Sequence, residues 1–270
     1  MRLAAVAVPR RSGRVAYGSA VVFRKNRPAA RGAYPAEAAG LRWLAAAGGA
    51  AVVDVLAVDD DVLELVELRS APATPKAAGT FGAALAATHD AGAAAWGAPP
   101  DGWTGPTFIG RQTMRCEPAA SFGEFYAEQR VLGYLRRAAD RGHVGGAVVD
   151  VVERACGRIA AGDFDGDEPP ARIHGDLWSG NVCWTPDGVV LIDPAAHGGH
   201  RETDLAMLAL FGAPCLPDII AGYLDAHPLA EGWRQRVPLH QLHPLAVHAA
   251  SHGPSYAEPL AAAARATLAL

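Results

Sequence analysis

The sequence predicts an α+β protein of two lobes, a small strand-rich N-terminal lobe and a larger, mainly helical C-terminal lobe. Three observations support this prediction. Short β-like runs alternate with one helical stretch over the first 68 residues, and long helical patterns dominate after a Pro/Ala-rich stretch at Ser70–Pro75. A compact strand-rich segment, Arg172–Asp193, is embedded among those helices. We therefore expect one lobe over residues 1–69 and a second over residues 70–270.

The N-terminal lobe is expected to hold several strands and one helix. Pro35–Ala47 is predicted to be helical because Leu41 and Leu44 form an apolar stripe and Gly48-Gly49 follows as a typical helix end. A Gly18-Ser19 turn is expected between the second and third of the predicted strands, which are Leu3–Val8, Arg14–Tyr17, Ala20–Lys25, Val52–Val58 and Val62–Leu68.

The C-terminal lobe is expected to be built mainly from long helices. Helical patterns cover Lys76–Ala91, Ser121–Arg141 and Gly146–Ala161. Helices resume from Glu202 to the end of the chain, and prolines are expected to interrupt them at Pro217, Pro238 and Pro254.

The composition restricts the partners and the compartment. The 270-residue chain is 50% apolar and 19% charged with a formal net charge of -4, so no basic excess favours nucleic acid or an anionic membrane. No apolar run approaches the roughly 18 residues that span a bilayer, and Met1–Val8 is too short for a signal peptide. Four separated cysteines without a CxxC pair argue against a zinc knuckle or a disulfide framework. We expect a soluble, cytoplasmic protein.

The most informative stretch is a predicted hairpin with polar residues at its open end. Thr185-Pro186-Asp187-Gly188 is a turn signal between two apolar runs. If Trp184 pairs with Val189, the antiparallel register sets Asn181 opposite Ile192, so Asn181 and Asp193 lie side by side. Asp176 precedes Asn181 by five residues, on the loop that leads into the hairpin.

Two carboxylates and one amide oxygen in this arrangement are typical of phosphoryl transfer. Hard cations such as Mg²⁺ prefer oxygen ligands, and protein kinases use an Asp-x4-Asn pair followed by a further Asp. In that chemistry the first Asp accepts the hydroxyl proton, while the Asn and the second Asp hold the metal ions. The alternative is an ordinary hairpin with a capped loop, which a lone Asp-x4-Asn would not exclude.

These residues resemble a known family. HGDLWSGN at His174–Asn181, followed by the hairpin and by IDPAAHGGHRETDLAMLALFG, is similar to the fructosamine kinase (ketosamine 3-kinase) family. That family is related to aminoglycoside and choline kinases within the protein-kinase-like fold. The resemblance extends to FRK at Phe23–Lys25, EFYAEQRVL at Glu124–Leu132 and HQLHPLAVHA at His240–Ala249, so it covers nearly the whole chain.

The resemblance implies roles for particular residues. Asp176 resembles the catalytic base, and Asn181 and Asp193 resemble the Mg²⁺ ligands. Lys25 resembles the lysine that contacts the nucleotide phosphates, with Glu37 as its ion-pair partner. The backbone of Glu67, Leu68 and Arg69 is where the family's adenine would bind.

Two further residues are candidates for the substrate side of the site. His174 precedes the base and is expected to brace its loop, with a plain structural histidine as the alternative. Trp178 is expected to pack against the sugar or the amine of the substrate, and core packing is the alternative for this side chain.

Two segments depart from the family pattern. The phosphate-binding loop corresponds to Arg10-Arg11-Ser12-Gly13, where Gly13 is the one glycine, although such loops need backbone N–H groups that can approach phosphate closely. After the second metal-binding Asp, the chain has His197-Gly198-Gly199-His200 where relatives often carry aromatic residues.

The resemblance implies an ATP- and Mg²⁺-dependent kinase that phosphorylates a sugar hydroxyl of ketosamines, the adducts of sugars with amines. The acceptor would be a small ketosamine or a glycated protein lysine, and the pathway role would be deglycation. An aminoglycoside- or choline-type phosphotransferase and a nucleotide-binding pseudokinase without turnover are the alternatives. A metal-dependent hydrolase is a further rival, supported by the histidine pairs His197/His200, His240/His243 and His248/His252 but not by any HExxH motif.

Overall fold

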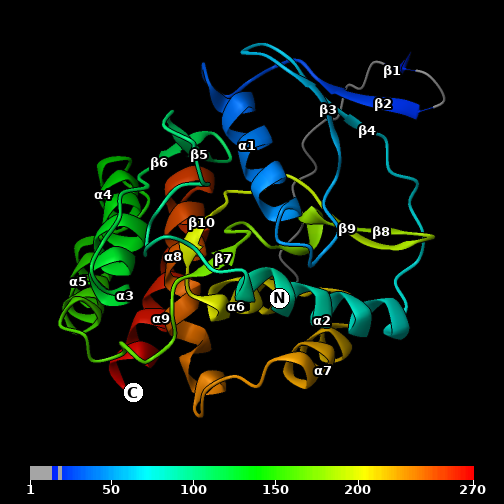
Figure 1. Cartoon of the computed structure of the whole chain (residues 1–270). Coiled ribbons are helices and arrows are strands. Elements are labelled where there is room, and N and C mark those ends of the chain that lie inside the picture. Colours follow the sequence, from blue (N-terminus) through cyan, green and yellow to red (C-terminus); the bar gives the residue numbers. More distant parts are fainter. Residues whose placement is uncertain (1–13, 18–19) are drawn as a thin grey trace.

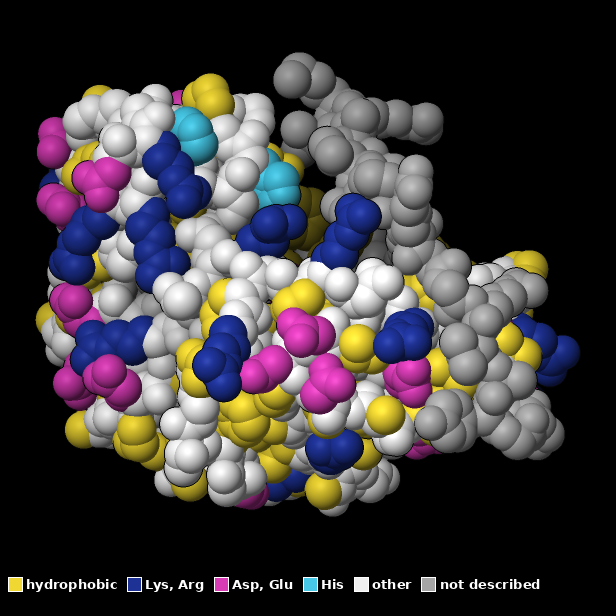
Figure 2. Space-filling view, turned by 90° about the horizontal axis from the view of Figure 1, so that it is seen from above, with side chains coloured by type: hydrophobic (Ala, Val, Ile, Leu, Met, Phe, Trp, Pro, Cys, Tyr) yellow, Lys and Arg dark blue, Asp and Glu magenta, His cyan; other side chains and the backbone are white. Residues whose placement is uncertain are grey.

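The computed structural model describes residues 14–17 and 20–270 of the chain. The predicted strand Leu3–Val8, the Gly18-Ser19 turn and Gly13 lie outside the described residues. Figure 1 shows a strand-rich upper part that carries one helix, above a larger helical part. On the face seen from above in Figure 2, Lys, Arg and His side chains border a hollow, while most Asp and Glu side chains lie farther from it.

The N-terminal part is an antiparallel sheet covered by one helix. The strands run in the order β1-β2-β4-β3. Helix α1 (Ala33–Ala45) packs its buried Tyr34, Ala38 and Leu41 against Leu63 and Leu65 of the sheet. The strands are β1 (Arg14–Tyr17), β2 (Ala20–Lys25), β3 (Val55–Val58) and β4 (Leu63–Val66).

The C-terminal part consists of helices and three small strand pairs. The helices are α2 (Pro75–Asp90), α3 (Phe122–Phe125), α4 (Gly133–Asp140), α5 (Gly146–Ala160), α6 (Arg201–Phe211), α7 (Leu216–Ala226), α8 (Trp233–His252) and α9 (Ala257–Leu268). The strand pairs that build the candidate site are β7 (Ala171–Ile173) with β10 (His197–Gly199), and β8 (Val182–Thr185) with β9 (Gly188–Leu191). No helix of the described residues is long and apolar enough to cross a membrane.

The predicted interruption at Pro238 is wrong, because α8 continues through both Pro238 and Pro244. A proline deprives the carbonyl four residues earlier of its helical partner. For Pro244 that carbonyl belongs to His240, and the hydroxyl of Tyr126 donates to it at 2.8 Å. For Pro238 it belongs to Arg234, which is exposed, so water can replace the missing donor. Pro254, in contrast, begins a 3₁₀ turn (Pro254–Tyr256) between α8 and α9, as predicted.

Two other local features were not predicted from the sequence. The helix predicted over Ser121–Arg141 contains a π-helical stretch at Tyr126–Leu132, between α3 and α4. A short hairpin, β5 (Thr107–Ile109) with β6 (Gln112–Met114), lies beside the N-terminal end of α1 in a segment without a strand prediction. A single π-helical stretch inside a helix changes the helical period only locally, and strands of three residues are too short to show an alternating pattern. Neither feature can therefore be recognised from periodicity.

Two backbone segments join the two parts around the candidate site. The segment 67–74 connects β4 to α2, and the backbone N–H of Ala71 donates to the Trp184 carbonyl at 2.8 Å. Residues 51–53 run parallel to β9, since Val53 N–H donates to the Leu191 carbonyl at 3.0 Å and Leu191 N–H donates to that of Ala51 at 2.8 Å. The predicted boundary between residues 69 and 70 falls in the connecting segment and stays a prediction.

Candidate active site

The hairpin β8–β9 has the register that the turn signal predicted. Trp184 pairs with Val189 and Val182 with Leu191, and Ile192 N–H donates to the Asn181 carbonyl at 3.2 Å. Asp193 follows with a φ of 53°, in the left-handed region that only a few per cent of non-glycine residues adopt. This turn takes the chain out of the strand direction directly after the hairpin, so the carboxylate of Asp193 reaches Lys25 of β2.

Asn181 links the loop before the hairpin to the residue after it. Its amide nitrogen donates to the backbone carbonyl of Asp176 at 2.8 Å, to the Asp176 carboxylate at 3.2 Å and to the backbone carbonyl of Asp193 at 3.3 Å. The amide nitrogen is thereby committed to the protein, and the amide oxygen, at the other end of the same group, lies away from these bonds. Asp176, Asn181 and Asp193 thus converge, as the hairpin geometry predicted.

His174 holds the Asp176 loop through both ring nitrogens. Its Nδ1 accepts the backbone N–H of Asp176 at 3.2 Å, so the proton is on Nε2, which donates to the Ile192 carbonyl at 2.9 Å. Burial lowers the pKa of His174, which keeps the ring neutral. Since the side chain is buried and both nitrogens are occupied, the geometry supports the bracing interpretation of His174.

Asp204 of α6 holds the same loop by accepting its backbone N–H groups, and this role was not predicted from the sequence. Its carboxylate is fully buried and accepts the backbone N–H groups of His174 at 2.7 Å and of Gly175 at 3.0 Å. A further bond joins it to Nε2 of His89 at 3.1 Å. Gly175 has a φ of 77°, and a Cβ there would lie 2.3 Å from the Ala195 carbonyl oxygen. An acidic residue within the apolar run of α6 was the available signal for Asp204.

Three charged side chains from distant segments meet on the other side of the site. Nζ of Lys25 lies 2.6 Å from the Glu37 carboxylate of α1 and 2.6 Å from the Asp193 carboxylate. The ion pair between Lys25 and Glu37 is therefore present, and Asp193 is a second partner that the sequence analysis did not assign to the lysine. Side-chain exposure is 19% for Lys25, 16% for Glu37 and 44% for Asp193, so the third is the most open to solvent.

Burial and charge set the protonation states in this cluster. Burial alone would lower the pKa of Lys25, but the Asp193 and Glu37 carboxylates together raise it, so the lysine is charged. Burial raises the pKa of Glu37, which Lys25 opposes. Burial, with the nearby Asp193 charge, raises the pKa of Asp176 to about 7. A carboxylate with such a pKa is suited to exchange protons near neutral pH.

The oxygen donors at the open end of the hairpin fit a hard divalent cation. Asn181 and Asp193 offer an amide oxygen and a carboxylate, the ligand types that Mg²⁺ takes from proteins, and substrate phosphates commonly complete its shell. Both of these ligands are oxygen donors, which favour Mg²⁺ over the transition metals that imidazole and thiolate ligands select.

The remaining predicted residues lie around this centre. The N–H of Glu67 donates to the Val21 carbonyl at 2.8 Å, Leu68 packs on the core of the N-terminal part, and Arg69 is exposed. Trp178 is 36% exposed, so the core-packing alternative does not describe it. Its ring covers Gly180, where a Cβ would lie 2.2 Å from the indole.

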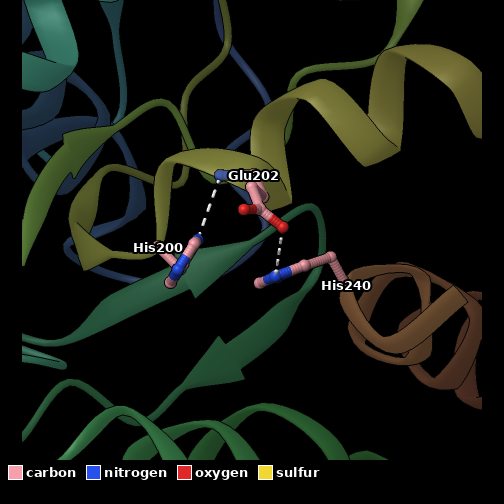
Figure 3. A group of neighbouring side chains, drawn as sticks. All are labelled: His200, Glu202 and His240. Atoms are coloured by element: carbon pink, nitrogen blue, oxygen red, sulfur yellow. Dashed lines mark hydrogen bonds and ion pairs between the residues drawn. The ribbon is translucent and has the colours of Figure 1, made fainter. Parts of the chain in front are cut away.

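The histidine pairs behind the rival hydrolase hypothesis do not form an open metal centre. Figure 3 shows His200, Glu202 and His240 together, with ligand atoms within 4.8 Å of one another. Arg236, however, donates to both carboxylate oxygens of Glu202, at 3.0 Å and 2.6 Å, and supplies the positive charge that a metal would bring. His197 accepts the Nε–H of the buried Arg130 at 3.1 Å.

Comparison with known proteins identifies the family. The sequence model of the family described as "Fructosamine kinase" matches residues 11–269 of the chain. The chain belongs to the fructosamine kinase family. Its fold is that of the protein-kinase-like phosphotransferases, as the sequence predicted.

Individual relatives agree with this assignment. A crystal structure described as a "putative fructosamine-3-kinase" from Thermobifida fusca is 48% identical, with a TM-score of 0.89 over 99% of this chain and 94% of that one. "Probable ketoamine kinase YniA" of Escherichia coli K12 is 41% identical over 122 residues, which are 45% of this chain and 41% of that protein. The match thus spans about two fifths of that curated relative. The choline kinase LicA of Streptococcus pneumoniae, 13% identical with a TM-score of 0.60 over 100% of this chain and 93% of that one, shares the fold.

Proposed function

We propose that this protein transfers the γ-phosphoryl group of ATP to a sugar hydroxyl of ketosamines, in the manner of a fructosamine 3-kinase. The observation that carries the proposal is the convergence of Asp176, Asn181 and Asp193 next to Lys25. Membership of the fructosamine kinase family adds the acceptor class, since the named relatives are ketoamine or fructosamine kinases. By this analogy the acceptor atom is the 3-hydroxyl.

Each residue at the centre has a defined task in this reaction. The carboxylate of Asp176 accepts the proton of the attacking hydroxyl and orients its oxygen toward the phosphorus. Asn181 and Asp193 would hold Mg²⁺, which when bound neutralises charge on the phosphate oxygens. Lys25, fixed by Glu37, would contact the same phosphates through its ammonium group.

The lobes divide these tasks. We propose that residues 1–69 form the nucleotide lobe and residues 70–270 carry the catalytic loop and the acceptor side. Adenine would bind along the backbone of 67–69, where β4 leads into the connecting segment. The phosphorylated adduct would be the product, and removal of sugars from amines or from protein lysines is the role that follows from the acceptor class.

An ADP-release assay over several acceptors tests the proposal. The panel holds fructose and ribose adducts of amines, with an aminoglycoside and choline as controls. We expect turnover with the sugar adducts. Phosphorylation of the aminoglycoside alone would move the function to the antibiotic kinases, and ATP binding without turnover of any acceptor would indicate a pseudokinase.

The variant Asp176→Ala is the matched test of the proposed base. Because it removes the proton acceptor and leaves Lys25, Asn181 and Asp193 in place, kcat should fall by about 10²- to 10⁴-fold. Affinity for Mg-ATP, measured by calorimetry, should change little. A turnover rate near that of the wild type would show that another group takes the proton.

A further inference from the structure

A row of aromatic rings begins at Trp178, two residues after the proposed base. The Trp178 indole meets Phe211, at the end of α6, edge-on with ring centroids 6.5 Å apart. Phe211 contacts His248 of α8 at 4.8 Å, and His248 stacks on His252 at 5.0 Å with an interplanar angle of 24°. Tyr256, in the turn after α8, contacts both histidines at 5.0 Å and 6.2 Å. We call Phe211, His248, His252 and Tyr256, together with Trp178, the aromatic row.

The aromatic row is accessible and largely uncharged. Trp178 and His252 are exposed, and Phe211, His248 and Tyr256 are half-buried, so each ring has area that a ligand can cover. Nδ1 of His248 lies 2.7 Å from the Pro244 carbonyl and therefore carries the proton that it donates. Burial, helped by His252, lowers the pKa of His248 to about 4, so its ring is neutral at pH 7. A neutral aromatic surface gains most by covering apolar or planar groups.

The position of the aromatic row relative to Asp176 determines which part of an acceptor can meet it. In a ketosamine the sugar carries the reacting hydroxyl, and the substituent of the amine must extend away from Asp176. The row starts on the same loop as Asp176 and continues through Phe211, the last residue of α6, to the C-terminal end of α8. We infer that the aromatic row binds the amine substituent of the acceptor and selects adducts whose amine carries an apolar aromatic group. This inference rests on the proposed function.

Two acceptors that differ only in this substituent test the inference. The fructose adducts of glycine and of phenylalanine share the sugar and the carboxylate, and only the second carries an aromatic ring. For the wild type we expect kcat/KM to be about tenfold higher with the phenylalanine adduct, the value of one partly buried aromatic contact.

Two variants of the aromatic row and one control locate the preference. Phe211→Leu keeps apolar volume but removes the ring, and His252→Ala alters an exposed position that carries little folding risk. Both should bring the ratio of the two kcat/KM values toward one. His227→Ala, which changes a half-buried histidine after α7 and outside the row, should leave the ratio at the wild-type value.

The possible failures are distinguishable. Turnover of both adducts without a preference in the wild type, or a preference that survives both variants, would overturn the role of the aromatic row and leave the kinase activity standing. Absence of phosphate transfer to either adduct by the wild type would refute the proposed function and this inference with it.

Discussion

The two sides of the candidate site are held by different forces. The catalytic loop, from His174 to Asn181, is fixed by hydrogen bonds in which its own backbone N–H and C=O groups take part, with the buried Asp204 at the base. The opposite side consists of Lys25 and two carboxylates, and the Asp193 carboxylate is 44% exposed.

This difference separates a fixed element from one that can change partners. A buried carboxylate that accepts backbone N–H groups cannot leave without stranding them, so the loop has one arrangement. The pair of Lys25 with Asp193 is open to solvent on the side of Asp193, and Lys25 keeps the Glu37 carboxylate as a second partner if Asp193 leaves. The bond from Lys25 to Asp193 can therefore be replaced when phosphate and a cation arrive, whereas the loop under Asp176 is ready beforehand.

The largest expected effect is at Asp204. Asp204→Ala leaves the N–H groups of His174 and Gly175 and a ring nitrogen of His89 without their buried acceptor. The free energy of unfolding should fall by about 3–5 kcal/mol, as measured by urea denaturation. Asp101→Ala is the matched control, because Asp101 accepts the Trp43 indole N–H but is 65% exposed, and its loss should be below about 1 kcal/mol. Equal losses in both variants would show that the buried bonds of Asp204 to the catalytic loop contribute no more than an exposed hydrogen bond does.

An intermediate effect is expected at Asp193. Asp193→Ala removes a proposed metal ligand while the fold keeps its buried supports, so affinity for Mg-ATP should fall by about tenfold or more with little change in the unfolding midpoint. Calorimetric titration measures the first and urea denaturation the second. Asp187→Ala, at the exposed turn of the same hairpin, is the control and should bind Mg-ATP normally. Unchanged affinity in Asp193→Ala would remove the metal role.

A third effect, which depends on pH and disappears in acid, is expected at Asp176. Its pKa, about 7 in the folded protein against a usual 3.8, means that the folded state holds a proton which the unfolded chain releases between these values. The ionised carboxyl therefore costs stability progressively as the pH rises from about 4 to 7. Asp176→Asn should be more stable than the wild type by about 1–3 kcal/mol at pH 8, and the gain should vanish near pH 4. Urea denaturation across this range measures it, and a gain that does not depend on pH would contradict the raised pKa.

Local signals predicted the parts of the site that lie close in sequence. Thr185-Pro186-Asp187-Gly188 determines the hairpin register, and the register alone places Asn181 next to Asp193. The pairing of Lys25 with Glu37 also followed, because a strand end and the next helix are neighbours in a family whose motifs the chain carries.

Contacts between distant segments were not predictable in the same way. The bond from Asp204 to the catalytic loop depends on how α6 packs under β7, and no periodicity of either segment records that packing. The proline-containing helix α8 depends on Tyr126, more than 110 residues earlier in the chain, to satisfy the His240 carbonyl. A rule based on proline alone does not record such a distant donor at Pro244, or the exposure of the Arg234 carbonyl that Pro238 leaves unpaired, and it predicted an interruption that the structure lacks.

The backbone bonds between residues 51–53 and β9 limit how the cleft can open. A hinge movement of the N-terminal sheet about the segment 67–74 must either take the β8–β9 hairpin with it or break the bonds at Val53, Leu191 and Ala71. In the first case the bonds from Asn181 to Asp176 take the catalytic loop along as well, so Lys25, Asp176, Asn181 and Asp193 keep their spacing.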